Sequence, residues 1–544
     1  MSHAPTITAI QKLGSILHDL SRTEPGVLPP YTRQRNALRA KLRGFLGVGA
    51  LAGLGAIYGY FYTILPSQFL IYLVAPLALL GLVIIWVLPD QETAPTRLMV
   101  KCFFAFAAVA VLWPDYVALA IPGLPWISMR RLLLFPMILC LLVGLSTSSR
   151  FRTQLKEYLE AWPLIPKLLG SFVVIQALSI LVAKEKTAAV KDFVDMQIMW
   201  TAIFFICVFA FQHKANIHRY LKLLVLCATF LAGVAFLENP YQKVLWADHI
   251  PGILKVDQQT LDLFISVRFR DGLYRVKTTF TNPLPYAEYM ALVSPVVLYF
   301  LIRAQSASAR IFLIIIDIVI FWAMSMAQAR LGMLGFITGH TLYGLLWSLR
   351  RWRTSRISLI GPAMSLAYPA IIAALALAIV SVSSFNNKVL GSQSTQGSNQ
   401  ARQTMFRHSV PLIIRSPIAG YGPRQGAEAL GYGAGGFLTI DSYLLTVALD
   451  YGVVGFLLYF GLLGLTMVKM LQIIWQGETD DSDLALLITI ILSVFVLIKT
   501  VLSQEDNNYM PFILMGMMMA LVRRAQTRGS IPIPGRVDAG LRTY

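Results

Sequence analysis

Long apolar runs recur along almost the whole chain and leave little room for a soluble domain. The 544 residues are 56% hydrophobic and only 13% charged, with a mean hydropathy of +0.65. Soluble domains have about a quarter of their residues charged, whereas runs of roughly 17–25 apolar residues can cross a bilayer as a helix. We therefore predict an all-α fold, a polytopic transmembrane helical bundle.

About 14 membrane helices are expected. They lie near residues 45–65, 69–89, 98–115, 130–147, 166–183, 195–212, 220–238, 285–302, 311–328, 331–349, 357–382, 441–468, 484–502 and 509–522. The short loops richest in Lys and Arg are 150–167, 212–222, 303–310, 350–356 and 523–528. Because basic loops stay on the inner side of a membrane, both termini are predicted to be cytoplasmic.

This reading divides the chain into seven parts. They are the cytoplasmic N-terminal tail 1–44, the N-terminal membrane helices 45–238, a first long outer loop 239–284, the central membrane helices 285–382, a second long outer loop 383–440, the C-terminal membrane helices 441–522 and the cytoplasmic tail 523–544. Short amphipathic helices are expected in the two long loops.

The net charge of +19 is explained by basic inner loops and by attraction to anionic membrane lipid. No nucleic acid is expected as a partner, because no basic soluble domain is present to bind it. Both long outer loops are nevertheless basic. Either long loops translocate whatever their charge, or some of their arginines bind an anionic ligand.

Several chemistries lack their motifs. There is no GxxxxGK[ST] phosphate loop, no HExxH and no cluster of His and Cys, so no nucleotide or metal cofactor is indicated. A Ser-His-Asp catalytic triad is an alternative that the sequence leaves open, although no GxSxG elbow is present.

Arginine is what the outer loops offer instead, since its guanidinium binds phosphate bidentately and stays charged. Arg275, Arg330 and Arg402 are the candidates for neutralising a diphosphate leaving group. For Arg330 the alternative is a side chain that reaches from the helix end to the membrane surface.

Residues 400–414 have the pattern of an amphipathic helix lying at the membrane surface. Apolar residues recur at helical spacing, at Met405, Phe406, Val410 and Ile413. The polar residues among them are Arg402, Arg407 and His408. A lone histidine at such a surface is either a functional group or a structural one, and the sequence leaves both open.

Three segments between residues 270 and 465 resemble, in order, the O-antigen polymerase and ligase superfamily of bacterial membrane proteins. RVKTTFTNPLPYAEYMAL (275–292) is similar to the family's Arg, Gly/Thr-Phe, Asn-Pro, Ala pattern at the opening of a helix. SMAQARLGMLGF (325–336) is similar to its Ser- and Arg-containing helix junction. ARQTMFRHSVPLIIRSPIAGYGP (401–423), followed by DSYLLTVALDYGVVG (441–455), is similar to its Arg, Pro-Leu/Ile-x-Gly-x-Gly, polar-pair-Tyr-Leu and Asp/Glu-x-Gly-x-x-Gly sequence.

This resemblance implies a glycosyltransferase at the periplasmic face of the bacterial inner membrane, with both long loops periplasmic. Members transfer glycan from undecaprenyl diphosphate to an acceptor without a metal or nucleotide. By position, Arg275, Arg330 and Arg402 would hold the diphosphate. The implied partners are an undecaprenyl-diphosphate-linked oligosaccharide, a chain-length regulator and export machinery.

One departure favours a polymerase of exopolysaccharide, capsule or O-antigen repeat units over a ligase. Ligases of the family carry His-Asn before the Tyr-Leu pair, where this chain has Asp441-Ser442. His408 could compensate for the missing histidine. Asp441 is either a general base for the acceptor hydroxyl or the N-cap of the following helix, and both roles can coexist.

Further substrate-binding candidates flank these arginines. Glu288, an acid inside a predicted membrane helix, is a candidate for binding sugar hydroxyls or for pairing with Arg275. Tyr421 and Arg424 lie in and just after the Gly-rich turn, and they join Arg407 and His408 as candidates.

Two other functions fit the same sequence. A ligase would transfer finished glycan to another acceptor. A transporter or flippase of lipid-linked sugar would suit the helix number and basic loops, but neither an internal repeat nor a pair of broken helices is evident.

Overall fold

The computed structural model describes residues 49, 52–61, 63–64, 70–120, 126–256, 258–354, 359–381, 393–434, 437–477 and 479–529. The predicted tail 1–44 and residues 530–544 lie outside this part of the chain. Two compact units are distinguished, one of residues 1–80 with 122–124 and one of residues 81–121 with 125–544. In the first, the described residues 52–61 are helical and mostly exposed, and α3 (Leu70–Val87) begins there.

Helices make up most of the second unit, as the all-α prediction requires. Before the first long loop they are α4 (Thr96–Leu112), α5 (Met129–Thr147), α6 (Ser149–Glu160), α7 (Leu164–Val182), α8 (Lys186–Met196), a π-helical stretch (Gln197–Ala202), α9 (Ile203–Ala210) and α10 (Lys214–Tyr241). After that loop they are α12 (Pro283–Arg303), α13 (Ala307–Ser325), α14 (Arg330–Thr354), α15 (Ile360–Ser381), α19 (Tyr443–Ile474), α20 (Asp480–Lys499) and α21 (Met510–Thr527).

The long loops carry the remaining elements. The first contains two short 3₁₀ turns (Ala247–His249 and Gly252–Leu254), α11 (Gln258–Ile265), β3 (Phe269–Arg270) and β4 (Leu273–Tyr274). The second contains α17 (Gln393–Arg415), α18 (Gly426–Leu430), β5 (Gly433–Ala434) and β6 (Phe437–Leu438). Together with β1 (Ala118–Leu119) and β2 (Ile127–Ser128), these strands form three two-stranded antiparallel hairpins, the whole strand content of the described residues.

Eight described helices are long and apolar enough to cross a membrane: α5, α7, the continuous helix 186–210, α10, α12, α13, α19 and α20. Helices also lie at the predicted spans 69–89, 98–115, 331–349, 357–382 and 509–522, but they do not meet the same test of length and composition. A multi-pass membrane protein is therefore confirmed, whereas the count of 14 and the location of the termini stay predictions.

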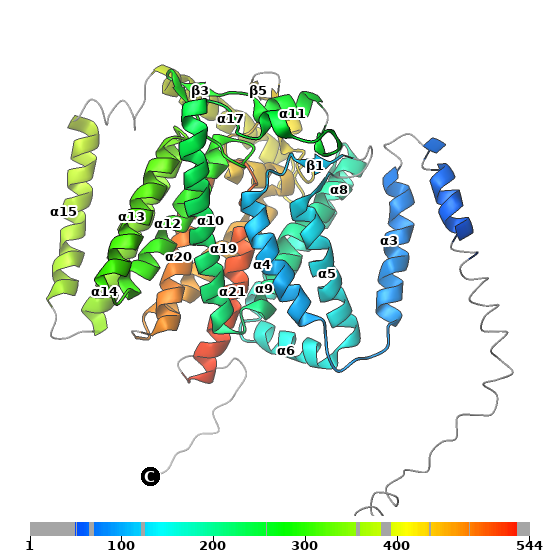
Figure 1. Ribbon diagram of the computed structural model, residues 1–544, viewed down its shortest axis with the longest axis horizontal. Coiled ribbons are helices and arrows are strands. Elements are labelled where there is room, and N and C mark those ends of the chain that lie inside the picture. Colours follow the sequence, from blue (N-terminus) through cyan, green and yellow to red (C-terminus); the bar gives the residue numbers. More distant parts are fainter. Residues whose placement is uncertain are drawn as a thin grey trace, which may run out of the picture. The chain divides into compact units, whose positions relative to one another are not determined.

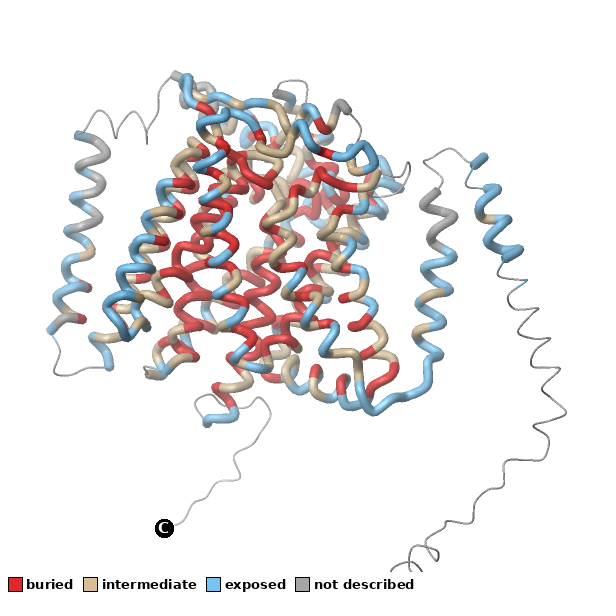
Figure 2. The backbone as a smooth tube through the Cα atoms, viewed as in Figure 1, coloured by how far each residue is buried: buried red, intermediate tan, exposed pale blue. Residues whose placement is uncertain are grey.

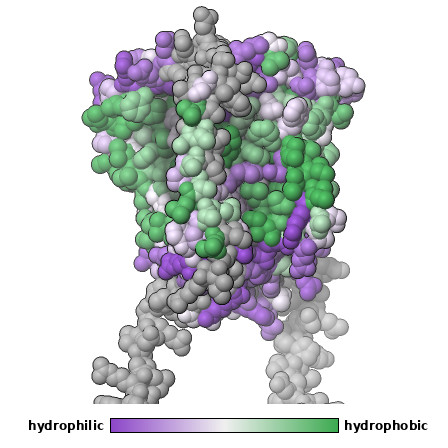
Figure 3. Space-filling view, turned by 90° about the vertical axis from the view of Figure 1, so that its left-hand side faces the viewer, coloured by the Kyte–Doolittle hydropathy of each residue, from purple (hydrophilic) through white to green (hydrophobic). Residues whose placement is uncertain are grey.

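Burial separates central helices from peripheral ones (Figure 2). In α12 and α20, 78% of the most apolar window is buried inside the protein, against 22% in α13. A peripheral helix that is this apolar and this exposed needs a hydrocarbon environment. Figure 3 shows the corresponding band of hydrophobic surface between two hydrophilic ends.

Local sequence determines where the central helix α12 begins. The side chain of Asn282 accepts a hydrogen bond from the Leu284 amide (3.2 Å), so it caps the first turn. Pro283 occupies the first helical position, where its missing N–H has no helical partner to lose. These residues fix the point at which the preceding loop, which carries Arg275, enters the bundle.

Both long loops fold at one end of the bundle. Figure 1 shows β1, β3, β5, α11 and α17 together at this end, which we call the loop end, and α6 at the opposite end. Segments more than a hundred residues apart in sequence are thus brought to the same place.

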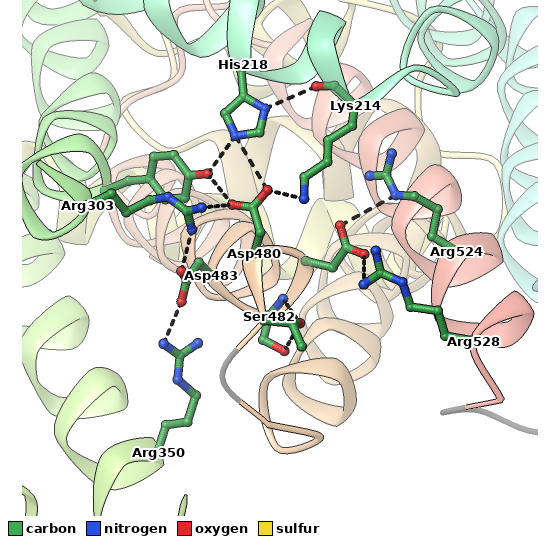
Figure 4. Close-up of polar contacts among 12 residues, drawn as sticks. Lys214, His218, Arg303, Arg350, Asp480, Ser482, Asp483, Arg524 and Arg528 are labelled. Atoms are coloured by element: carbon green, nitrogen blue, oxygen red, sulfur yellow. Dashed lines mark hydrogen bonds and ion pairs between the residues drawn. The ribbon is translucent and has the colours of Figure 1, made fainter. Parts of the chain in front are cut away.

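Three carboxylates at the start of α20 organise the end opposite the loop end (Figure 4). Acids at a helix N-terminus are favoured by the helix dipole. The ion pairs run from Asp480 to Lys214 and Arg303, from Asp483 to Arg303 and Arg350, and from Asp481 to Arg524 and Arg528. Nε2 of His218 also lies 3.6 Å from Asp480. They tie α20 to α10, α12, α14 and α21.

The Arg350 side chain is only 6% exposed, so its pairing with Asp483 is costly to remove. We predict that Asp483→Asn lowers the free energy of unfolding by about 2 kcal/mol, because a buried guanidinium loses its carboxylate. Thermal unfolding in detergent measures this loss. Asp248→Asn breaks an exposed pair with Lys243 and should change stability by about 0.5 kcal/mol or less. Equal effects of the two substitutions would contradict the assignment.

Candidate active site: an arginine cluster at the loop end

The β3–β4 hairpin brings two arginines together. Asp271 and Gly272 have positive φ values of +50° and +77°, which is the geometry that an Asp-Gly hairpin turn favours. The Arg275 amide donates to the Arg268 carbonyl (2.9 Å), so these two residues lie opposite each other just beyond the two-residue strands. A short hairpin therefore places Arg268 beside Arg275.

The next residues tie Arg275 to the turn before α14. The Val276 amide donates to the Met326 carbonyl (3.1 Å), and Nε of Arg275 donates to the Ala327 carbonyl (3.1 Å). Arg330, the first residue of α14, follows three positions later. Arg275 and Arg330 thus belong to segments joined by hydrogen bonds, and that they serve one site stays a prediction.

Electrostatics extends this group to further cations. Burial lowers the pKa of Arg275 to about 10, and the neighbouring Arg270 and Arg268 contribute. Burial likewise lowers the pKa of Arg330, with Arg270 and Arg402 acting in the same direction and Asp271 against them. Arg270 therefore lies near both Arg275 and Arg330.

We call these five residues the arginine cluster: Arg268, Arg270, Arg275, Arg330 and Arg402. Two of the described carboxylates, Asp271 and Asp441, interact with it. Positive charge is in excess, and like charges held together raise the energy of the empty site. An anion bound between them would relieve this repulsion.

Two guanidinium groups in the cluster also have unused donors. Nη2 of Arg275 and Nη1 of Arg330 are buried and have no hydrogen-bond partner among the described residues. An unpaired buried donor costs about 1–3 kcal/mol. The cluster therefore has both an excess of positive charge and unpaired N–H donors. A phosphate oxygen could balance the charge and accept the hydrogen bonds.

Arg402 comes to the cluster on α17, with Asp441 beside it. Nε of Arg402 lies 3.8 Å from Oδ2 of Asp441, and both side chains are slightly more than one-third exposed. The alternative that Asp441 is the N-cap of the following helix is wrong, because α19 begins at Tyr443 and Ser442 occupies the cap position. Asp441 is thereby one residue farther from the helix, next to an arginine.

A backbone junction holds α17 in place. The turn 417–426 that follows α17 docks against a break in α19 at Gly452, whose φ is +69°. The hydrogen bonds that join them include Tyr421 N to Leu449 O (2.8 Å), Gly422 N to Asp450 O (3.0 Å) and Val453 N to Pro417 O (2.7 Å). A Cβ at Gly452 would lie 2.4 Å from the Pro417 carbonyl oxygen, so glycine alone permits this approach.

The residues predicted on the same helix as Arg402 do not join the cluster. Arg407 and His408 are exposed on α17, and helical geometry turns them roughly 140° and 120° away from Arg402, in opposite directions. Met405 is buried on the face that packs against the second loop, whereas Phe406 is 58% exposed. Residues 400–414 are helical as predicted, as part of α17, whereas their placement at the membrane surface stays a prediction.

Arg424 also lies apart from the cluster. Its guanidinium pairs with Glu505 (2.5 Å), Asp192 (3.0 Å) and Asp195 (3.6 Å). These carboxylates, Glu505 first, raise the pKa of Arg424 well above its usual value. Its charge is already matched by protein groups, so its predicted role in substrate binding has no geometric support and stays a prediction.

Glu288 and Tyr421 have structural contacts. Glu288 is buried and pairs with Lys499 (3.0 Å) and Asn507 (3.0 Å), so Lys499 takes the place that Arg275 had in the sequence-based alternative. The Tyr421 hydroxyl donates to the Leu412 carbonyl (3.0 Å) and thereby closes the turn back onto α17. These contacts account for both residues without a substrate.

Sequence reasoning missed Arg268 and Arg270 as site residues. The Asp271-Gly272 pair is a recognisable hairpin signal and could have placed Arg268 opposite Arg275. It also missed Glu238, a buried acid on α10 that binds the segment after Arg275. No local pattern in the sequence marks that contact.

The fold and site define a class, a multi-pass membrane protein with a cationic cluster assembled from its two long loops and the start of α14. Residues 315–460 match the family model described as O-antigen ligase. This match supports the resemblance to the O-antigen polymerase and ligase superfamily that the three segments predicted, a family of glycosyltransferase-like membrane proteins. Arg330, Arg402 and Asp441 fall within the match, and Arg275 precedes it. No curated protein matches the chain.

Substitution of Gly452 tests the junction. We predict that Gly452→Ala lowers the free energy of unfolding by about 2–4 kcal/mol and reduces activity, because the added Cβ meets a carbonyl oxygen at a positive φ. Gly461→Ala is the matched control on the same helix, since nothing lies within 4 Å of its Cβ position. It should leave stability unchanged or raise it by up to about 1 kcal/mol. Equal thermal stability of the two variants in detergent would argue against the junction.

Proposed function

We propose that the protein is a bacterial polysaccharide polymerase. It would transfer a glycan from undecaprenyl diphosphate to a lipid-linked repeat unit, which is the acceptor. The observation that carries this proposal is the pair of buried guanidinium nitrogens, on Arg275 and Arg330, without hydrogen-bond partners among the described residues. A diphosphate has the charge and the number of acceptor oxygens that such a site lacks.

The chemistry follows from where negative charge develops. As the bond between the anomeric carbon and the diphosphate oxygen breaks, both electrons of that bond go to the leaving oxygen. Fixed guanidinium groups aimed at that oxygen stabilise the transition state more than the ground state. Arg275, Arg330 and Arg402 would supply this stabilisation, with Arg270 near the first two.

The acceptor hydroxyl forms the new bond to the anomeric carbon and must lose its proton. Asp441 is the proposed base, since it lies beside Arg402 and carries an oxygen that can accept a proton. The proton would pass to Asp441, the glycan to the acceptor oxygen, and undecaprenyl diphosphate would leave. Charge and atoms balance without a metal or a nucleotide.

A ligase is the second candidate, because the matching family model is described as O-antigen ligase. The Asp441-Ser442 pair at the place of the ligase His-Asn favours the polymerase. His408 does not restore a histidine to the site, since it lies on another face of α17 from Arg402. A deletion strain separates the two: loss of a polymerase leaves single repeats or none, and loss of a ligase leaves long undelivered chains.

We further propose that the loop end faces the periplasm from the inner membrane, where a polymerase would meet lipid-linked repeat units. The basic charge of loops 150–167, 303–310 and 350–356, which would then be cytoplasmic, supports this orientation. A chain-length regulator and export machinery would be partners of such an enzyme.

Alanine substitutions in the cluster test the function. Each of Arg275→Ala, Arg330→Ala and Arg402→Ala should reduce polymer at least about 100-fold in cells, because each removes a donor to the leaving group. Polymer length is read on gels and the protein level by immunoblot of membranes. Arg415→Ala removes an exposed charge from the same helix as Arg402 and should leave polymer normal. Normal long polymer from all three cluster variants would rule out the mechanism.

A further inference from the structure

A buried carboxylate on α10 lies beneath the segment that carries Arg275. Glu238 has no exposed surface. Its oxygens accept three hydrogen bonds: from the Tyr274 hydroxyl (2.8 Å), the Lys277 amide (3.1 Å) and the Thr278 amide (2.8 Å). These donors flank Arg275 on both sides, so the carboxylate fixes the backbone on which that arginine stands.

The segment held by Glu238 is strained. Thr278 is fully buried with a φ of +51°, a conformation that a β-branched residue rarely adopts and that costs about 1–3 kcal/mol. Its amide is one of the three donors to Glu238. Strain of this kind persists only where surrounding contacts determine the conformation, and Glu238 provides that contact.

The side chain of Lys277 reinforces the same arrangement from the other direction. Its ammonium donates to the carbonyls of Phe264 and Ser266. Ser266 lies two residues before Arg268, which directly precedes β3 (Phe269–Arg270). The two sides of the hairpin are therefore joined by the Lys277 side chain as well as by the hydrogen bonds between the strands.

An ionised carboxylate suits these three donors better than an amide does. A carboxylate is acceptor-only, with two oxygens. A glutamine offers one oxygen, and its NH₂ group would face one of the N–H or O–H donors. An acid so deeply buried costs free energy unless it is fully hydrogen-bonded. A carboxylate at this position therefore indicates that its two acceptor oxygens are needed to hold the three donors in place.

We propose that Glu238 is a positioning residue that sets Arg275 for diphosphate binding. This rests on the proposed function of the arginine cluster and adds to it a residue that contacts no substrate. This role predicts a change in anion affinity opposite to the change that charge alone predicts. Removing a negative charge near a cationic site should strengthen anion binding by Coulomb attraction, whereas loss of the Arg275 position should weaken it.

The test is a double-mutant cycle on the purified full-length protein in detergent, with inorganic pyrophosphate as the probe. Glu238→Gln should raise the Kd for pyrophosphate about 10-fold, and Tyr274→Phe, which removes one donor, about 2- to 3-fold. In the Arg275→Ala background neither should weaken binding further, because residues that act through one another are not additive. Glu428→Gln removes an exposed carboxylate at the loop end and should not weaken binding.

The outcomes are separable. If the unsubstituted protein does not bind pyrophosphate, the diphosphate site is wrong and this proposal falls with it. If it binds, but Glu238→Gln and Tyr274→Phe tighten binding or lose affinity equally with and without Arg275, only the positioning role is overturned. Tyr274→Phe keeps the test decisive if Glu238→Gln does not fold.

Discussion

Like charges held close together at the end of an apolar bundle repel one another, and that repulsion must be offset by contacts elsewhere. The arginine cluster brings five guanidinium groups together with two carboxylates beside them. The protein holds them with main-chain hydrogen bonds, which do not neutralise their charge. A site kept cationic in this way is prepared for an anion, because the geometry is set before the ligand arrives.

Two separate anchors hold the cluster. On one side, the hairpin and the segment after it bind the turn before α14 and the buried carboxylate of Glu238. On the other side, the turn 417–426 docks backbone to backbone at the break in α19, and this docking fixes the end of α17, the helix that carries Arg402. The ion pairs around α20 act at the opposite end (Figure 4).

Much of the bundle could be predicted from apolar periodicity. The central span expected at 285–302 is α12 (Pro283–Arg303), because burial in a membrane bundle requires a continuous apolar run. The span expected at 220–238 is longer, α10 (Lys214–Tyr241), since its first turn is polar and carries no hydropathy signal. Asp441 was a reasonable N-cap by residue type, but Ser442 occupies the cap position, without a side-chain cap hydrogen bond. Such one-residue choices depend on tertiary context.

The site was only partly predictable. Arg275, Arg330 and Arg402 could be selected by residue type and family pattern, whereas their convergence depends on contacts between distant segments. Glu288 and Arg424 resembled ligand-binding residues because a charged group near a membrane needs a partner. Their partners are protein residues far away in the sequence, Lys499 for Glu288 and Glu505 for Arg424. Pairing of this kind cannot be read from one sequence.

The most direct test of the central claim is elongation by the purified protein. A defined undecaprenyl-diphosphate-linked repeat unit, incubated with the protein in detergent, should give a ladder of glycans that differ by one repeat. One undecaprenyl diphosphate should be released for each bond formed, without added metal or nucleotide. Unchanged substrate under conditions where the protein stays folded, or transport across vesicles without any lengthening, would contradict the account.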